Sequence, residues 1–129
     1  MLTYIKIYII AFLIFFIIDL VWLGLIAKDL YQSKIGFLLK ENYNMIAAGL
    51  FYTIYIIALV FFVINPADSW QHALFAGMFF GFITYATYDM TNLATIKDWP
   101  VSLTIIDICW GTFLGGSTSA LTYFLIEII

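Results

Sequence analysis

The sequence is poor in charged residues. Only 10% of its 129 residues are Asp, Glu, Lys or Arg, whereas 65% are hydrophobic, and the mean hydropathy is +1.07. A soluble domain devotes about a quarter of its residues to charge, because these residues cover the surface that faces water. So few charges exclude a soluble globule and a disordered tail. The composition therefore predicts a small integral membrane protein.

Arginine, cysteine and histidine are scarce as well. Five Lys, no Arg and eight acidic residues give a net charge of −3, so no basic surface is present for nucleic acid. The single cysteine, Cys109, can form neither an internal disulfide nor a cysteine-rich metal site, and we interpret it as a packing residue. The single histidine, His72, has no Ser or Cys partner in a recognisable catalytic motif.

What the sequence has in abundance is long apolar runs. Each of the four runs reaches the length of about 20 residues that a spanning helix needs. The runs do not alternate as the strands of a membrane barrel would, and in hydrocarbon a helix satisfies its own backbone. The sequence therefore predicts an all-α integral membrane protein, a single domain built as a four-transmembrane-helix bundle. The predicted spans are residues 2–27, 45–64, 73–96 and 101–126.

The first run is interpreted as a retained helix and not as a signal peptide, because it contains Asp19 and lacks a small-residue cleavage site. Residues 28–44, which follow it, contain Leu30, Tyr31 and Ile35 at helical spacing between lysines. This pattern predicts a short cytoplasmic interfacial helix on the anionic lipid surface. A solvated loop is the alternative.

The lysines predict the orientation of the chain. Lys28, Lys34, Lys40 and Lys97 lie in the first and third connections, whereas Lys6 alone lies near the opposite side. Cytoplasmic loops of membrane proteins carry the excess of positive charge. We therefore expect a multi-pass protein of the bacterial inner membrane with both termini in the periplasm.

Three acidic residues interrupt the apolar runs, and they fall at one depth. Asp19 lies nine residues before Lys28, Asp89 eight before Lys97, and Asp107 nine after Asp98. At about 1.5 Å per residue, each lies roughly 12–14 Å inside the predicted cytoplasmic boundary. Intramembrane acids are costly and mark ion pathways and substrate sites, so this layer is the candidate functional site.

Two of these acids continue stripes of small residues. Both stripes contain the GxxxG spacing that lets helix backbones approach closely. The spacing predicts that the third and fourth spans pack through these faces and direct Asp89 and Asp107 into the bundle. The stripes are Gly77, Gly81, Tyr85 and Asp89 in the third span, and Asp107, Gly111, Gly115 and Ser119 in the fourth.

Each acid is followed three residues later by a possible hydrogen-bond donor. These donors are Trp22 after Asp19, Asn92 after Asp89 and Trp110 after Asp107, and Tyr52 and Tyr55 of the second span are expected to face the same layer. Aromatic residues near span ends are interpreted as interface anchors; they are Tyr4, Tyr8, Trp70 and Trp99. The candidate binding residues are Asp19, Trp22, Tyr85, Tyr88, Asp89, Asn92, Asp107 and Trp110.

Four strings of the sequence carry a family resemblance. DLVWLGLIAKDLY, GLFYTIYI, TYDMTNLATIKDWP and IDICWGTFLG resemble the bacterial predicted membrane proteins of domain-of-unknown-function family 2177. The resemblance implies a four-span inner-membrane protein, and it implies no reaction. It places the following residues in motif positions: Asp19, Trp22, Tyr88, Asp89, Asn92, Asp98, Trp99, Asp107 and Trp110.

Three functions fit the acid layer. The acids can be protonated and act as hydrogen-bonding glue between helices, which would make the protein structural. They can bind or pass a cation, a proton or a small solute, with Asp19, Asp89 and Asp107 as oxygen ligands for a divalent cation such as Mg²⁺. They can also serve an intramembrane lipid-modifying enzyme as an acid–base pair. Membrane lipids and a homodimeric second copy are the expected partners, and no cofactor other than a divalent cation is indicated.

Overall fold

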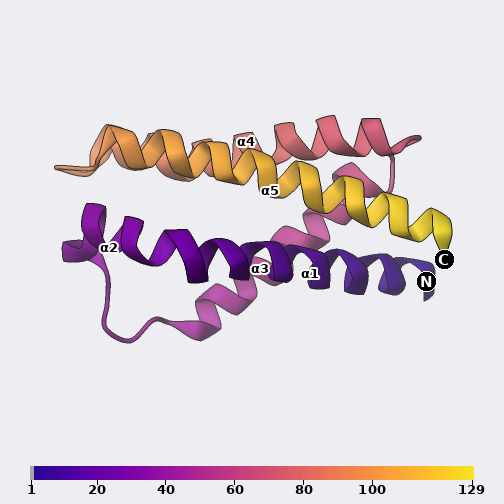
Figure 1. The fold of residues 1–129 in the computed structure, drawn as a ribbon, viewed down its shortest axis with the longest axis horizontal. Coiled ribbons are helices and arrows are strands. Elements are labelled where there is room, and N and C mark those ends of the chain that lie inside the picture. The colour runs from indigo at the N-terminus through magenta and orange to yellow at the C-terminus, as the bar shows by residue number, and fades with distance from the viewer. Residues whose placement is uncertain (1) are drawn as a thin grey trace.

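The computed structural model describes residues 2–129, and this part of the chain is helical without strands. The all-helical prediction is confirmed, and a helix covers each predicted span. Short π-helical turns continue two of the helices, and Figure 1 shows the course of the chain. The elements are α1 (Leu2–Trp22), η1 (Leu23–Ala27), α2 (Lys28–Ile35), η2 (Gly36–Leu38), α3 (Met45–Leu59), η3 (Val60–Ile64), α4 (Trp70–Thr95) and α5 (Val101–Ile128).

Polar caps and a tight turn set the helix boundaries. The side chain of Asn44 accepts a hydrogen bond of 3.0 Å from the backbone N–H of Ala47, and Ser69 accepts one of 3.1 Å from His72. Such caps satisfy backbone donors that have no partner inside the first helical turn. Between α4 and α5, Asp98 adopts a φ of 63°, a left-handed conformation that Asp tolerates better than most residues. The turn makes α4 and α5 an antiparallel hairpin.

The hairpin is packed through its glycines, as the two stripes predict. A Cβ atom added to Gly81 would collide with the backbone carbonyl of Gly111, and one added to Gly77 would collide with Gly115. Only glycine permits this approach of two helix backbones. The close contact directs Asp89 and Asp107 into the protein, where they are 0% and 5% exposed.

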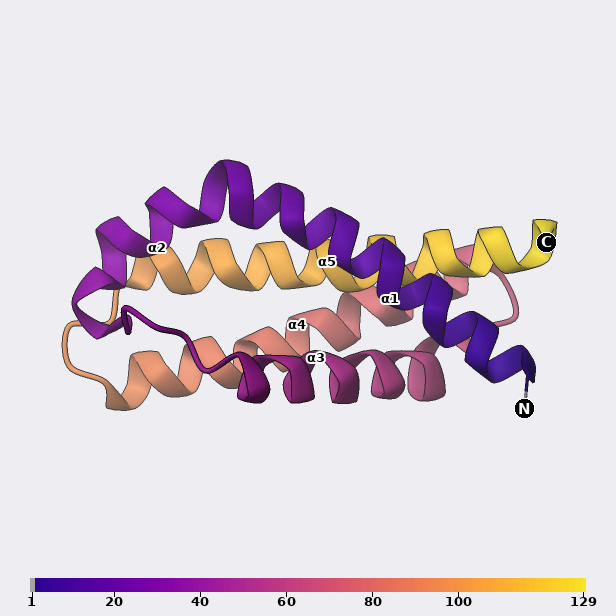
Figure 2. The same ribbon diagram turned by 90° about the horizontal axis from the view of Figure 1, so that it is seen from below.

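The other helices close around this hairpin. Figures 1 and 2 show both termini at one end of the molecule, here named the terminal end, and α2 with the α4–α5 turn at the other, here named the lysine-bearing end. Towards the terminal end an apolar core joins α1, α3, η3 and α5. It includes Ile7, Ala11, Phe15, Ile56, Leu59, Val63 and Leu114.

The outer surface of the helices is strongly apolar. Leu13, Phe61, Phe79 and Phe124 are each more than half exposed, as side chains that face lipid would be. The continuous helix Leu2–Leu38 and the helix Met45–Ile64 are long and apolar enough to cross a membrane by length and composition.

The segment after the first predicted span is helical and continues from α1. The π-helical turn η1 separates it from α1, and Figure 2 shows the helix changing direction there. On α2, Ile35 is buried against Trp99 and Leu103. Part of the predicted interfacial helix therefore packs on protein, and its position at a membrane surface stays a prediction.

Candidate binding cavity

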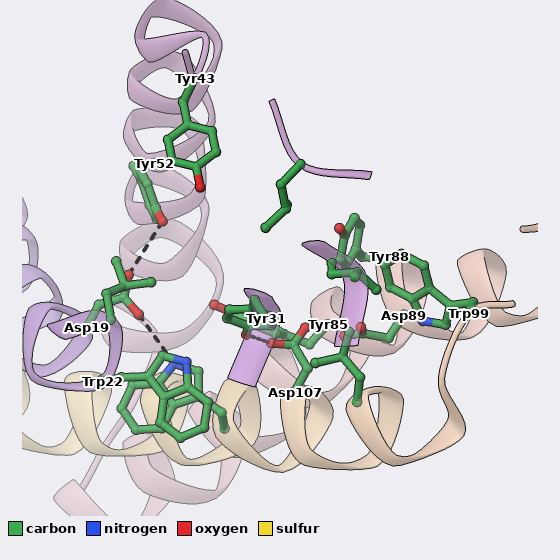
Figure 3. Close-up of a pocket in the computed structure, with 15 residues that line it drawn as sticks. Asp19, Trp22, Tyr31, Tyr43, Tyr52, Tyr85, Tyr88, Asp89, Trp99 and Asp107 are labelled. Carbon is green, nitrogen blue, oxygen red and sulfur yellow. Dashed lines mark hydrogen bonds between the residues drawn. The ribbon is translucent and has the colours of Figure 1, made fainter. Parts of the chain in front are cut away.

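A cavity of about 300 Å³ lies between the helices towards the lysine-bearing end. We name it the aromatic–acid cavity, because its wall combines aromatic rings with carboxyl groups, and Figure 3 shows it. Helices α1, α2, α3, α4 and α5 all contribute. The lining residues are Asp19, Asp89 and Asp107; Trp22, Trp99 and Trp110; Tyr31, Tyr43, Tyr52, Tyr85 and Tyr88; and Leu23, Ile35, Leu39 and Leu103.

Asp19 is held by two hydrogen bonds. Its Oδ1 accepts from Trp110 Nε1 at 3.3 Å, and its Oδ2 accepts from the Tyr52 hydroxyl at 3.4 Å. The carboxyl is 5% exposed and joins α1 to both α3 and α5. Because both oxygens have protein partners, Asp19 acts as a tie, meaning a side chain that links helices by hydrogen bonds.

Asp107 has one protein partner. The Tyr31 hydroxyl of α2 donates a hydrogen bond to its Oδ1. This contact spans 76 residues of sequence and fastens α2 over the end of the α4–α5 hairpin. Asp107 therefore holds α2 against the cavity and also forms part of the cavity wall.

Asp89 differs from the other two acids. It is 0% exposed, no N–H or O–H group of residues 2–129 donates to either of its carboxyl oxygens, and its carboxyl neighbour within hydrogen-bonding reach is Asp107. Figure 3 shows it beside Asp107, with Asp19 farther away near Tyr52. A buried polar group without a partner destabilises the fold by a few kcal/mol, so Asp89 is the acid of the wall with free capacity to bind.

The aromatic residues of the wall are held in fixed pairs. Trp22 and Trp110 stack with ring centroids 4.5 Å apart and an interplanar angle of 7°, and Tyr88 meets Trp99 edge to face at 5.9 Å. Trp99 Nε1 also donates a hydrogen bond of 3.0 Å to Thr104. These contacts give the cavity rigid aromatic faces.

The structure brings together every predicted binding residue except Asn92. The side chain of Asn92 does not line the cavity, although its position three residues after Asp89 predicts a contact. At residue 92 the backbone carbonyl accepts the helical hydrogen bond from Ile96. The hydrogen bond from Asn92 to Asp89 that the spacing predicts is absent, and a role of Asn92 in binding stays a prediction.

The predicted pairing of each acid with its own tryptophan is wrong. Trp110 donates to Asp19 on another helix and not to Asp107, and Trp22 Nε1 has no partner among residues 2–129. Trp110 stacks on Trp22 of α1, and the Tyr31 hydroxyl donates to Asp107 in its place.

Tyr31 and Tyr43 are cavity residues that the sequence reasoning missed, because the segment between the first two spans was assigned to the membrane surface. The anchor interpretation of Trp99 is corrected, since that residue is 7% exposed and lines the cavity. The expectation for Tyr52 is confirmed by its bond to Asp19, whereas Tyr55 is buried in the apolar core. For Tyr31, the signal in the sequence was its helical spacing with Leu30 and Ile35, which predicts a helix with one apolar face.

The acids do not form a conventional metal centre. Within residues 2–129 no three His, Cys, Asp or Glu side chains gather as a metal ion would require. Asp19 is engaged by Trp110 and Tyr52, which leaves Asp89 and Asp107 as neighbours. A divalent cation at that pair stays a prediction.

A helical chain with an apolar exterior and an acidic, aromatic cavity belongs to the class of helical membrane proteins. The family model DUF2177, described as a predicted membrane protein, matches residues 4–124, and the chain belongs to this family. No curated protein and no solved structure matches the chain. The family description states no activity, and the cavity is the feature of the chain that points to a function.

Proposed function

We propose that the chain is a four-span protein of the bacterial inner membrane whose aromatic–acid cavity binds a cation or a small cationic solute. The lengths of the less apolar helices support four spans. α4 has 26 residues and α5 has 28, which correspond to about 39 and 42 Å at 1.5 Å per residue, more than the hydrocarbon thickness of about 30 Å. Glycine, threonine and aspartate lower their hydropathy, and the glycines and aspartates face the protein interior.

The distribution of lysine supports the proposed orientation. Lys28, Lys34, Lys40 and Lys97 belong to α2 and to the connections at the lysine-bearing end, while both termini lie at the opposite end (Figure 1). Positive charge near helix ends marks the cytoplasmic side. The orientation therefore has both termini in the periplasm and the cavity nearer the cytoplasm.

The single observation that carries the proposed binding is Asp89. The other two acids have hydrogen-bond partners, so interhelical glue accounts for Asp19 and for one oxygen of Asp107. Asp89 lacks hydrogen bonds of the kind that hold the other two acids, because no N–H or O–H group among residues 2–129 donates to it and its carboxyl neighbour is Asp107. An intramembrane acid of this kind marks an ion or substrate site.

The lining residues do not favour nucleophilic catalysis. Among the residues that the structure describes, no Ser, Cys or His lines the cavity. The cavity also lies within one chain, so binding there does not require the homodimer that we expect. Binding is the function that the side chains support best.

Carbodiimide labelling tests the proposal. Dicyclohexylcarbodiimide reacts with protonated carboxyl groups in apolar surroundings, and the adduct rearranges to a stable acylurea that mass spectrometry locates. We expect labelling of Asp89 in purified protein, no labelling at this position in Asp89→Asn, and slower labelling in the presence of at least one of K⁺, Mg²⁺ or choline. Asp19→Asn is the matched control and should leave the labelling of Asp89 intact. Labelling that none of these cations slows would overturn the proposal.

A further inference from the structure

We infer that the ligand of the aromatic–acid cavity is an organic ammonium cation, bound by the carboxyl group of Asp89 and by the faces of the surrounding aromatic rings. This inference rests on the proposed function and names the class of its ligand. The ammonium ligand follows from four properties of the cavity: the charge of its wall, its carboxylate oxygens, its aromatic rings and its volume.

The charges of the wall select a cation. Three Asp line the cavity, and no Lys or His among residues 2–129 does. An anion would meet three acidic side chains and no positively charged one. A ligand without a hydrogen-bond donor would leave Asp89 buried without a donor, which is the costly arrangement that already exists.

The wall offers few carboxylate oxygens that are not already hydrogen-bonded to the protein, which disfavours a metal ion held by the protein alone. Ca²⁺ takes six to eight oxygen ligands and Mg²⁺ takes about six in a strict octahedron. Asp89 offers two free oxygens and Asp107 offers one, because Tyr31 occupies the other. Both oxygens of Asp19 are engaged as well. An ammonium group requires far fewer oxygen ligands.

The aromatic content of the wall is high and suits an ammonium group. Eight of the lining residues are Trp or Tyr. The face of an aromatic ring attracts an organic cation placed within about 6 Å of its centroid, and aromatic cages recognise quaternary ammonium groups in this way. The stacked Trp22–Trp110 pair and the edge-to-face Tyr88–Trp99 pair hold their rings in place without a ligand. Figure 3 shows Tyr88 and Trp99 nearer to Asp89 than Trp22 is, so the Tyr88–Trp99 pair supplies the rings closest to this carboxyl.

The size of the cavity limits the ligand to a small molecule. Its volume of about 300 Å³ lies at the lower end of the range of ligand pockets. An ammonium head group of a few carbon atoms fits this volume. Such a head group can belong to a free solute or to a membrane lipid such as phosphatidylethanolamine, and the chemistry at Asp89 is shared by both.

Tryptophan fluorescence is a direct probe of binding. Three of the four tryptophans line the cavity, and the fourth, Trp70, is an exposed residue at the start of α4. Trp70→Phe therefore gives a protein whose fluorescence reports the cavity alone. Titration of this protein with choline should give a saturable change in fluorescence.

Two comparisons test the chemistry of recognition. 3,3-Dimethylbutan-1-ol has the shape of choline with a neutral carbon in place of the nitrogen, and we expect it to bind at least about tenfold more weakly. Asp89→Asn should weaken choline binding by a similar factor. Tyr88→Leu removes an aromatic face and should bind choline several-fold more weakly than Tyr88→Phe, which keeps the face. Tyr4→Leu, at an equally exposed residue outside the cavity, is the control and should bind choline normally. Tyr88 is 55% exposed, so both variants should fold.

Lipid nanodiscs distinguish the two sources of the ammonium group. If the head group of a lipid fills the cavity, discs of phosphatidylethanolamine suppress the response to choline and discs of phosphatidylglycerol do not. If the ligand is a free solute, both discs give the same response. Either result supports the inference.

Two outcomes overturn the inference. Equal binding of choline and its neutral analogue would show an apolar pocket without cation recognition. Protection of Asp89 from carbodiimide by Mg²⁺ or K⁺ but not by choline would overturn the ammonium ligand and leave the proposed cation site standing. If none of the three cations protects Asp89, both proposals fall.

Discussion

The two ends of the molecule use the same helices for different purposes. Towards the terminal end, α1, α3 and α5 bury aliphatic and aromatic side chains such as Phe15, Ile56 and Leu59, which are at most 1% exposed. Towards the lysine-bearing end, the same helices surround a cavity with carboxyl groups. The first region gains stability from packing. The second leaves packing incomplete and keeps one acid, Asp89, without a partner among residues 2–129.

This difference predicts different responses to substitution. Changes in the apolar core should lower the free energy of unfolding, and changes at Asp89 should alter binding with little effect on stability. Stability in each case is measured by titrating the protein with sodium dodecyl sulfate in mixed micelles and following helix content.

Phe15→Ala should lower the free energy of unfolding by about 3–5 kcal/mol, the usual range for deleting a buried aromatic ring. Phe15 is 1% exposed and packs edge to face with Tyr52 at a centroid distance of 5.7 Å. Leu13→Ala is the control, because Leu13 is 55% exposed on the same helix and its loss should change the free energy by less than about 0.5 kcal/mol. Equal effects of the two substitutions would contradict a packed core at this end.

Gly81→Ala should lower the free energy of unfolding by about 1–3 kcal/mol, because overpacking shifts the backbone. The added methyl group would meet the carbonyl of Gly111. The same substitution at Gly49 of α3 is the matched control, since no atom lies within 4 Å of a Cβ there. Gly49→Ala should stabilise the helix slightly. A harmless Gly81→Ala would show that α4 and α5 are farther apart than the hairpin described above.

Asp19→Leu should lower the free energy of unfolding by about 1–3 kcal/mol, since it leaves two buried donors without an acceptor. These donors are the Tyr52 hydroxyl and Trp110 Nε1. Asp19→Asn keeps one acceptor oxygen and should have a smaller effect. A loss for Asp19→Asn as large as that for Asp19→Leu would contradict the role of Asp19 as a hydrogen-bonding tie.

Local patterns predict the helices and the convergence of the acids, but not the partners of each acid. The apolar runs predict the helices, and the glycine stripes predict the α4–α5 contact that places Asp89 beside Asp107. The pairing of Trp110 with Asp19 depends on the relative rotation of α1 and α5, which the spacing within either helix does not determine.

The position of Tyr31 could not be predicted from the residues next to it in the sequence. Its helical spacing with Ile35 predicts an amphipathic helix, and both a lipid surface and a protein surface satisfy that pattern. The turn η1 decides between them, because it redirects α2 and lets Tyr31 reach Asp107.

Asp89→Leu should have the smallest effect on stability and the largest on binding. A buried carboxyl without a partner does not stabilise the fold, so its replacement by an apolar side chain of similar size should leave the free energy of unfolding within about 1 kcal/mol of the original or raise it. Choline binding, followed by fluorescence in the Trp70→Phe protein, should disappear in the same variant. Asp19→Leu is the internal comparison, because both acids are almost fully buried and only Asp19 has both oxygens bonded within the chain. If Asp89→Leu destabilised the protein as much as Asp19→Leu, Asp89 would be a second tie between helices, and the two ends of the bundle would no longer differ in purpose.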